Sequence, residues 1–283
     1  MAKVYDALKR AEQERKLLRA DPSPSVAPFY WALPQSAQPA ERPPFWRRWG
    51  WGARRRLRGV AATADESNKR RYSLLQPDSY VAEQFRGLRG RIDAMASKVP
   101  IRTIAVTSAC PGEGKTTAAV NIATVTALSV GRRVLLIDCD LRKPTVARTL
   151  GLKPEAGLME VLTDATHLDA AIVKVEDLNL DVLAVRRKAR NPSELLGSAR
   201  MRELVDEVVR RYDRVILDTP AALDLPDAKA VSELCDGIVM VVRADVTPQR
   251  DVDTVLEILD RGRVLGFVLN GAEIDRERYE YTA

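Results

Sequence analysis

Residues 107–117 have an order and spacing suited to holding a phosphate chain: Thr-Ser-Ala-Cys-Pro-Gly-Glu-Gly-Lys-Thr-Thr. An apolar run precedes them and a helix-like segment follows, which gives the order strand, glycine-rich loop, helix. Such a loop points backbone N–H groups at phosphate oxygens, at the positive end of a helix dipole. Lys115 can reach the β- and γ-phosphates, and the Thr116 hydroxyl can bind Mg²⁺. Because Ala109 replaces the first glycine of the G-x-x-x-x-G-K-[ST] pattern, a chance glycine-rich turn is the alternative. We predict nucleotide contacts from seven consecutive residues: Pro111, Gly112, Glu113, Gly114, Lys115, Thr116 and Thr117.

Acidic residues end two other apolar runs of the chain. Asp138 and Asp140 follow the run 134–137, and Asp218 follows the run 215–217. In an open α/β sheet, ligands bind outside the carboxyl ends of the strands, so these acids are expected beside the phosphates. We predict that Thr116, Asp138 and Asp218 hold Mg²⁺. Asp138 is also the candidate base for an attacking hydroxyl, with Asp140 in support. The alternative is that the two acids cap the segment that follows them.

Positioning and charge neutralisation are the main needs of phosphoryl transfer, and this set of side chains supplies both. Lys115, a metal ion and a nearby carboxylate therefore make a phosphoryl-transfer site the leading prediction.

From about residue 78 onward, apolar runs alternate with segments of helical pattern. Continuous apolar runs between helices are typical of parallel strands that are covered on both faces. We therefore predict an α/β fold of the P-loop NTPase class over residues 78–272, with a mostly parallel central sheet flanked by helices on both faces. The expected strands are 102–107, 133–138, 180–185, 214–218, 237–243 and 264–269.

The N-terminal part of the chain has a different composition and is expected to form a helical and disordered arm. Residues 1–20 have the pattern of an amphipathic helix. Residues 21–77 are rich in proline, then in tryptophan and arginine, and we predict a largely disordered linker there. Trp46, Trp49 and Trp51 alternate with arginines, which suits the headgroup region of a membrane. A groove on a partner protein and a solvated basic linker are the alternatives.

The net charge of +6 belongs to this arm alone. Residues 1–72 carry 16 Lys and Arg against 7 Asp and Glu, whereas the rest carries 29 against 32. A basic arm on a mildly acidic domain predicts an anionic partner for the arm, and no nucleic acid. The three cysteines are far apart and form no C-x-x-C pair, which fits a reducing cytoplasm. No apolar run is long enough to span a membrane.

The three motifs resemble those of the bacterial tyrosine kinases (BY-kinases) of capsule and exopolysaccharide assembly. The stretch 111–117 is similar to their Walker A motif, and Ile137-Asp138-Cys139-Asp140-Leu141-Arg142-Lys143-Pro144 is similar to Walker A′. The stretches 191–196 and 265–270 resemble two further family segments, and the resemblance covers roughly residues 78–271. It implies a P-loop fold, ATP and Mg²⁺ as cofactors, and Asn270 near the adenine. Glu83, Arg86 and Arg89 match the E-x-x-R-x-x-R helix, which implies contacts between subunits of a homo-oligomeric ring; a solvated helix face is the alternative.

The related MinD/ParA ATPases carry an extra lysine five positions before the Walker lysine. Cys110 occupies that position here, and Pro111 follows it, which favours the kinase family. The family's kinases end in a tyrosine cluster that is autophosphorylated, and the tail 273–283 offers Tyr279 and Tyr281 as phosphoacceptors. Two tyrosines near a terminus can also be accidental.

The resemblance therefore implies an ATP-dependent protein-tyrosine autokinase that regulates exopolysaccharide or capsule polymerisation and export. The chain resembles the separate cytoplasmic members, which a transmembrane chain-length regulator activates, and we expect it to associate peripherally with the inner membrane. A MinD/ParA-like ATPase switch that acts at a membrane or partner protein is the alternative. A catalytically weak regulatory subunit is a third interpretation.

Overall fold

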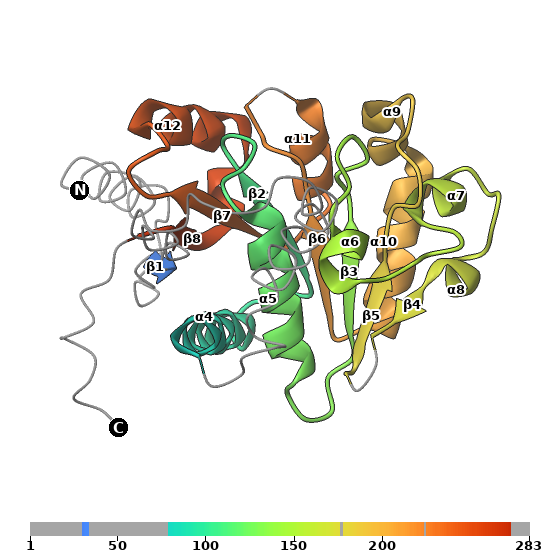
Figure 1. Ribbon diagram of the computed structural model, residues 1–283, viewed down its shortest axis with the longest axis horizontal. Coiled ribbons are helices and arrows are strands. Elements are labelled where there is room, and N and C mark those ends of the chain that lie inside the picture. Colours follow the sequence, from blue (N-terminus) through green and yellow to red (C-terminus); the bar gives the residue numbers. More distant parts are fainter. Residues whose placement is uncertain (1–29, 34–78, 176–177, 224, 273–283) are drawn as a thin grey trace, which may run out of the picture.

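The computed structural model describes residues 30–33, 79–175, 178–223 and 225–272. At its centre lies an eight-stranded sheet in the order β1-β8-β7-β2-β6-β3-β5-β4 (Figure 1). Neighbouring strands are parallel throughout, except that β4 and β5 are antiparallel. The strands are β1 Tyr30–Leu33, β2 Thr103–Ser108, β3 Val134–Asp138, β4 Val173–Lys174, β5 Leu180–Leu183, β6 Arg214–Asp218, β7 Gly237–Arg243 and β8 Val264–Asn270.

The central strands β2, β3 and β6 are buried along their whole length and mostly apolar, because both faces of the sheet are covered. Successive side chains point to opposite faces, so each strand contributes to two cores. In β6, Val215 and Leu217 pack into one core, whereas Ile216 packs into the other. Ala105 of β2 belongs to the first core, and Ile104 and Val106 on either side of it belong to the second.

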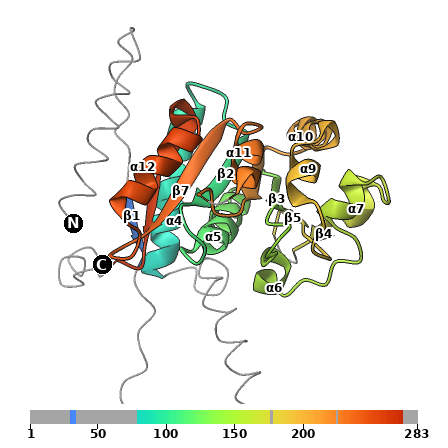
Figure 2. The ribbon, with the colours of Figure 1, turned by 90° about the horizontal axis from the view of Figure 1, so that it is seen from above.

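Helices cover each face of the sheet (Figure 2). α4, α5 and α6 lie on one side, and α10, α11 and α12 lie on the other. No helix of the described ranges is long and apolar enough to cross a membrane. The helices are α4 Tyr80–Ala96, α5 Lys115–Ala127, α6 Val146–Leu150, α7 Leu158–Leu162, α8 Leu168–Ala171, α9 Pro192–Leu196, α10 Ala199–Arg211, α11 Pro226–Ser232 and α12 Gln249–Ile258, with a 3₁₀ turn at Arg261–Arg263.

α5 is the helix that follows the glycine-rich loop, and it is buried almost all round. Eleven of its thirteen residues are buried, including Asn121 and three threonines. It packs on α4 and on the strands of the sheet. A helix fixed on all sides holds its first residues, Lys115 and Thr116, in one position relative to the strand ends.

The predicted fold class and the six predicted strands are confirmed. Two strands were missed. β4 has only two residues, too few for a sequence pattern. β1 lies inside the stretch 21–77, for which the sequence predicted a largely disordered linker, so no strand was expected at these four residues. Tyr and Trp favour strands, and the backbone of Tyr30–Leu33 pairs with Phe267–Asn270 of β8. The predicted helix at 1–20 lies outside the described residues.

Candidate functional site

The glycine-rich loop joins β2 to α5, as the sequence predicted, and two of its glycines adopt left-handed backbone conformations. Gly112 has φ +87° and Gly114 has φ +100°. Side chains strongly disfavour this region, so glycine is required at both positions. At Gly114 space is limiting as well, because a Cβ atom there would lie 2.2 Å from Nδ2 of Asn270.

Asn270 and Glu113 fix this loop from inside the protein. Asn270 ends β8, and its Nδ2 donates to the Glu113 carbonyl at 2.8 Å. The buried Glu113 carboxylate accepts from the Cys110 N–H at 2.9 Å and from the Thr247 hydroxyl. Both residues were predicted to contact the nucleotide. The structure commits the Glu113 carboxylate to protein partners, so only its backbone is available to a phosphate.

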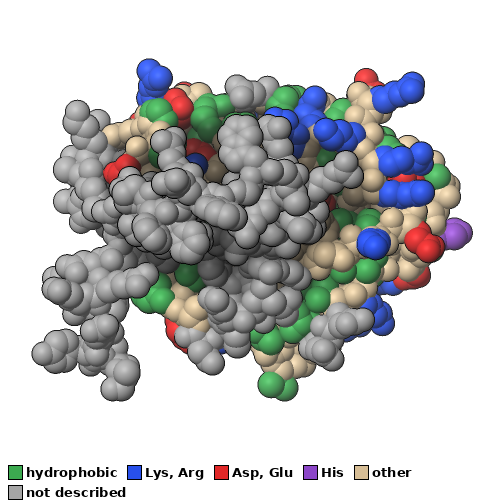
Figure 3. All heavy atoms as spheres, in the orientation of Figure 1, with side chains coloured by type: hydrophobic (Ala, Val, Ile, Leu, Met, Phe, Trp, Pro, Cys, Tyr) green, Lys and Arg blue, Asp and Glu red, His purple; other side chains and the backbone are tan. Residues whose placement is uncertain are grey.

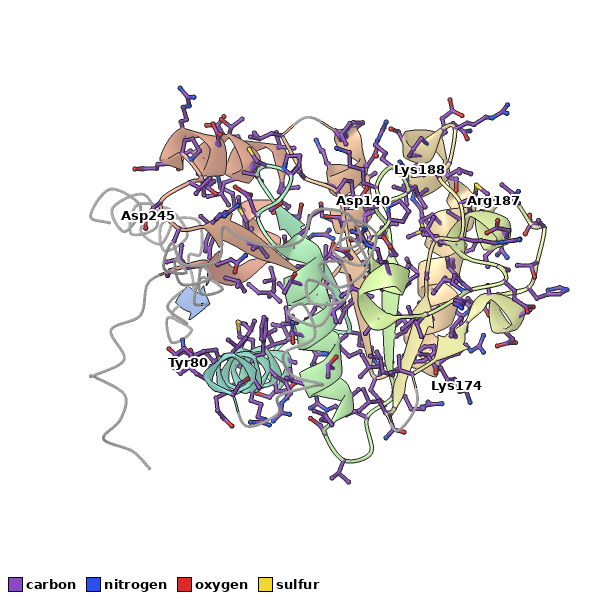
Figure 4. All side chains as sticks on the ribbon, viewed as in Figure 1. Tyr80, Asp140, Lys174, Arg187, Lys188 and Asp245 are labelled. Atoms are coloured by element: carbon purple, nitrogen blue, oxygen red, sulfur yellow. The ribbon has the colours of Figure 1, made fainter. Side chains whose placement is uncertain are left out.

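The acids predicted from the strand ends come together beside α5. β3 and β6 are neighbours, and Asp138 lies opposite Asp218 in the register. Thr116 donates to Oδ2 of Asp218 at 2.7 Å. Lys115 lies 3.3 Å from Oδ2 of Asp140. The parallel order of these strands therefore brings one lysine, one hydroxyl and three carboxylates to the same end of the sheet, where Asp140 can be found in Figure 4.

Backbone N–H groups hold two of these carboxylates in place. Asp138 accepts from Thr145 N and Val146 N through Oδ2, and from Asp140 N through Oδ1, each at 3.1 Å. Asp140 accepts from Lys143 N at 2.9 Å. The prediction that the pair only caps the following segment describes these contacts in part, but it leaves the Lys115 contact unexplained.

Burial strongly perturbs the carboxylates of the two strand ends. Burial, and then the charge of Asp218, hold the pKa of Asp138 well above its usual range, although two backbone hydrogen bonds oppose this. Burial likewise raises the pKa of Asp218 to about 7, against the effects of Lys115 and Thr116. Excess negative charge in a buried place favours a cation at this position.

A magnesium ion fits the donor set. All candidate ligands are oxygens, which Mg²⁺ prefers, and the buried Oδ1 of Asp218 has no hydrogen-bond partner within the part of the chain that is described. No three His, Cys, Asp or Glu side chains in the described ranges could hold a metal by themselves. This agrees with the usual Mg²⁺ site, where phosphate oxygens and water complete the coordination.

Two groups of polar residues at this end of the sheet were missed by sequence reasoning. The Thr145 hydroxyl donates to the Thr116 hydroxyl at 3.0 Å. Asp227, at the start of α11, is buried and accepts from Arg142 Nε at 2.7 Å and from the Ser193 hydroxyl at 2.5 Å. The hydrogen bond to Asp227 raises the pKa of Arg142 further. This network joins the loop after β3 to α9 and α11. Its only sequence signals were that Arg142 and Ser193 lie in the family-like stretches.

The helix residues predicted to join subunits make contacts within the chain. Glu83 and Arg86 form an ion pair on α4. Arg89 donates to the Val125 carbonyl of α5 at 2.8 Å, so its guanidinium ties α4 to α5. Glu83 is exposed and the two arginines are half-buried. Their role between subunits stays a prediction.

Basic side chains gather on the loop that follows β5. Arg186, Arg187, Lys188 and Arg190 are exposed on the loop after β5. This loop is hydrogen-bonded to the loop after β3, from Ala189 N to the Leu141 carbonyl at 3.2 Å. Lys and Arg side chains are prominent on this part of the surface, and Arg187 and Lys188 are labelled on the sticks view (Figures 3 and 4). The predicted phosphoacceptors Tyr279 and Tyr281, and Trp46, Trp49 and Trp51, lie outside the described residues.

The loop has two glycines in the left-handed conformation and joins a strand to a buried helix. An aspartate of the neighbouring strand accepts a hydrogen bond from the threonine that follows the loop lysine. These features together define a P-loop NTPase. Residues 101–261 match a family model described as an AAA domain. The tyrosine-protein kinase YwqD of Bacillus subtilis is 37% identical over 206 residues, which cover 72% of this chain and 86% of YwqD. The chain belongs to the bacterial tyrosine kinase family.

Further comparisons agree with this assignment. The succinoglycan biosynthesis transport protein ExoP of Rhizobium meliloti is 36% identical over 204 residues, which cover 70% of this chain and 26% of ExoP. The crystal structure of the chimerical protein CapA2B2 superposes with a TM-score of 0.69 at 33% identity, over 73% of this chain and 91% of that one. The septum site-determining protein MinD of Pyrococcus horikoshii, solved with Mg-ADP, gives a TM-score of 0.51 at 26% identity, over 60% of this chain and 70% of that one.

Proposed function

We propose that this protein is an ATP-dependent protein-tyrosine kinase that phosphorylates its own C-terminal tyrosines and thereby regulates exopolysaccharide or capsule polymerisation and export. One observation carries the proposal: the phosphate-loop lysine contacts Asp140, the phosphate-loop threonine donates to Asp218, and Asp138 lies opposite Asp218 in the register of the sheet. The name of YwqD supports tyrosine as the acceptor, and the name of ExoP supports the link to polysaccharide.

In this proposal, Lys115 and the amides of residues 111–117 bind the phosphates of ATP. Thr116, Asp138 and Asp218 hold Mg²⁺, which neutralises charge on the phosphate oxygens. The tyrosine oxygen attacks the γ-phosphorus, the bond to the ADP oxygen breaks, and the hydroxyl proton passes to a carboxylate. Asp138 is our candidate for that base, with Asp140 holding Lys115. The oxygen-only donor set and the Mg-ADP complex of MinD support the metal.

The acceptor can be tested by mass spectrometry after incubation with ATP and Mg²⁺. We expect phosphotyrosine at Tyr279 and Tyr281, loss of both signals in Lys115→Met, and loss at the substituted positions in Tyr279→Phe/Tyr281→Phe. ATP hydrolysis without phosphotyrosine, also in the presence of a partner's activating segment, would favour the ATPase switch instead. Nucleotide binding without hydrolysis would favour the regulatory subunit.

We further propose a ring of identical subunits joined through Glu83, Arg86 and Arg89, and a transmembrane chain-length regulator as activator. Arg86→Glu is expected to lower the mass measured by light scattering, whereas an unchanged mass would refute the interface. A peripheral position at the inner membrane, on the cytoplasmic side, rests on Trp46, Trp49 and Trp51. If replacing these tryptophans by alanine leaves binding to anionic vesicles unchanged, the membrane proposal is wrong.

A further inference from the structure

Thr145 connects three parts of the site that are far apart in the sequence. It follows Pro144 at the end of the loop from β3 and precedes the first residue of α6. Its hydroxyl donates to the Thr116 hydroxyl at 3.0 Å, and Thr116 donates to Asp218 at 2.7 Å. The two threonines and the aspartate therefore form a continuous chain of hydrogen bonds that ends on a buried carboxylate.

This chain fixes the direction in which Thr116 can bind a metal. A hydroxyl oxygen has one bond to carbon, one proton and two lone pairs. The proton of Thr116 is directed at Asp218, and one lone pair accepts from Thr145. Only one lone pair is left to bind a metal. Its direction is set by the bond to carbon, the proton and the lone pair that accepts from Thr145. Without the Thr145 hydroxyl, the two lone pairs would be equivalent and the Thr116 oxygen would be less firmly held.

The backbone of Thr145 has a separate task that a side-chain substitution leaves in place. Its N–H and that of Val146 donate to Asp138 at 3.1 Å each. Thr145 is half-buried, so a side chain of similar volume can replace it. The hydroxyl can therefore be removed while Asp138 keeps its backbone donors.

We propose that Thr145 is a positioning residue of the magnesium site, acting through Thr116. This inference rests on the proposed function, because it assumes that a magnesium–nucleotide complex binds at the phosphate loop. Thr145 aligns the metal-binding lone pair of Thr116 before the ion arrives, so that binding the ion orders less of the site. Loss of one such hydrogen bond predicts about tenfold weaker Mg²⁺ binding.

The test compares Thr145→Val, Thr145→Ala and Thr145→Ser with a matched control, Thr149→Val. Thr149 lies one helical turn further on in α6, and its buried hydroxyl has no partner among the described residues. Binding of a fluorescent ADP analogue is measured in EDTA and then during titration with Mg²⁺, and thermal melting checks that each variant folds.

We expect Thr145→Val and Thr145→Ala to raise the apparent dissociation constant of Mg²⁺ about tenfold, with analogue affinity in EDTA changed less than twofold. Thr145→Ser should restore Mg²⁺ binding, and Thr149→Val should match the wild type. Unchanged or tighter Mg²⁺ binding in the Val variant would overturn the positioning role, as would an equal loss in EDTA. A wild-type protein whose analogue binding ignores Mg²⁺ would instead refute the metal site of the proposed function, and this inference with it.

Discussion

Removing the Arg142 guanidinium is expected to leave a buried negative charge without its ion-pair partner. Asp227 is 1% exposed. Its carboxylate accepts hydrogen bonds from Arg142 Nε at 2.7 Å and from Arg142 Nη2 at 3.3 Å. In Arg142→Met the Ser193 hydroxyl is the one remaining donor that the structure shows to this carboxylate. The substitution keeps an apolar stem of similar length, so the change concerns charge more than packing.

The size of the effect follows from burial on the two sides of the pair. Breaking a buried ion pair by removing one partner typically destabilises a protein by about 3–5 kcal/mol. Arg142 is 37% exposed, so water can reach the position that it leaves and solvate part of the charge. We therefore expect Arg142→Met to lower the free energy of unfolding by about 2–3 kcal/mol. Asp227→Asn removes the charge itself. The double variant should therefore lose clearly less free energy of unfolding than the sum of the losses in the two single variants.

Urea unfolding of the four proteins in EDTA gives the coupling between the two residues directly. Arg200→Met is the matched control, because its partner Asp164 is 75% exposed and such pairs contribute about 1 kcal/mol or less. Two results would show that Asp227 is solvated and that the reasoning is wrong. One is that Arg142→Met lowers the free energy of unfolding no more than Arg200→Met does, and the other is that the effects of Arg142→Met and Asp227→Asn add in the double variant.

Three further predictions test the site and the core. Gly114→Ala should destabilise the protein more than Gly112→Ala, because both force a side chain into the left-handed region but only the first meets Asn270; equal urea midpoints would contradict this. Asp218→Asn should raise the melting temperature in EDTA, more at pH 8 than at pH 5. The folded-state pKa of Asp218, about 7, exceeds the unfolded value, so the wild type loses stability as this carboxyl ionises between about pH 4 and pH 7. An equal gain in melting temperature at both pH values would refute this prediction. Arg214→Met should raise the free energy of unfolding by about 1 kcal/mol, because two nitrogens of this buried guanidinium have no partner in the described part of the chain. Asp93 loses Arg214 but keeps its ion pair with Arg132. A lower free energy of unfolding in urea would contradict this prediction.

Local sequence was sufficient for the phosphate loop and for the strand-end acids. Lys115 and Thr116 follow a strand and begin a helix, so their position is set by adjacent residues. Asp138 and Asp218 end parallel strands, whose carboxyl ends must meet on one side of a sheet. These rules need no knowledge of which strands are neighbours.

Contacts between distant side chains could not be derived in this way. Thr145 meets Thr116 across 29 positions of sequence, and Arg142 meets Asp227 across 85. Neither pair has a spacing or period that predicts it. The place of Asn270 near a nucleotide base stays a prediction, and nothing in the sequence indicated that its amide also donates to the loop backbone at Glu113, because this contact depends on how closely β8 and the loop approach. β1 was missed for a related reason, because the run 30–33 becomes a strand only where β8 offers it free backbone groups.

The pairing of β1 with β8 determines how this chain can be shortened. A protein that begins after residue 33 would leave the outer side of β8 uncovered between Phe267 and Asn270. Exposed strand edges recruit other chains, so such a truncation is expected to self-associate through its backbone. The same truncation would loosen Asn270, which supports the phosphate loop. Because this truncated protein keeps Trp46, Trp49, Trp51 and the neighbouring arginines, weakened nucleotide binding or new oligomers would report on an open edge of the sheet.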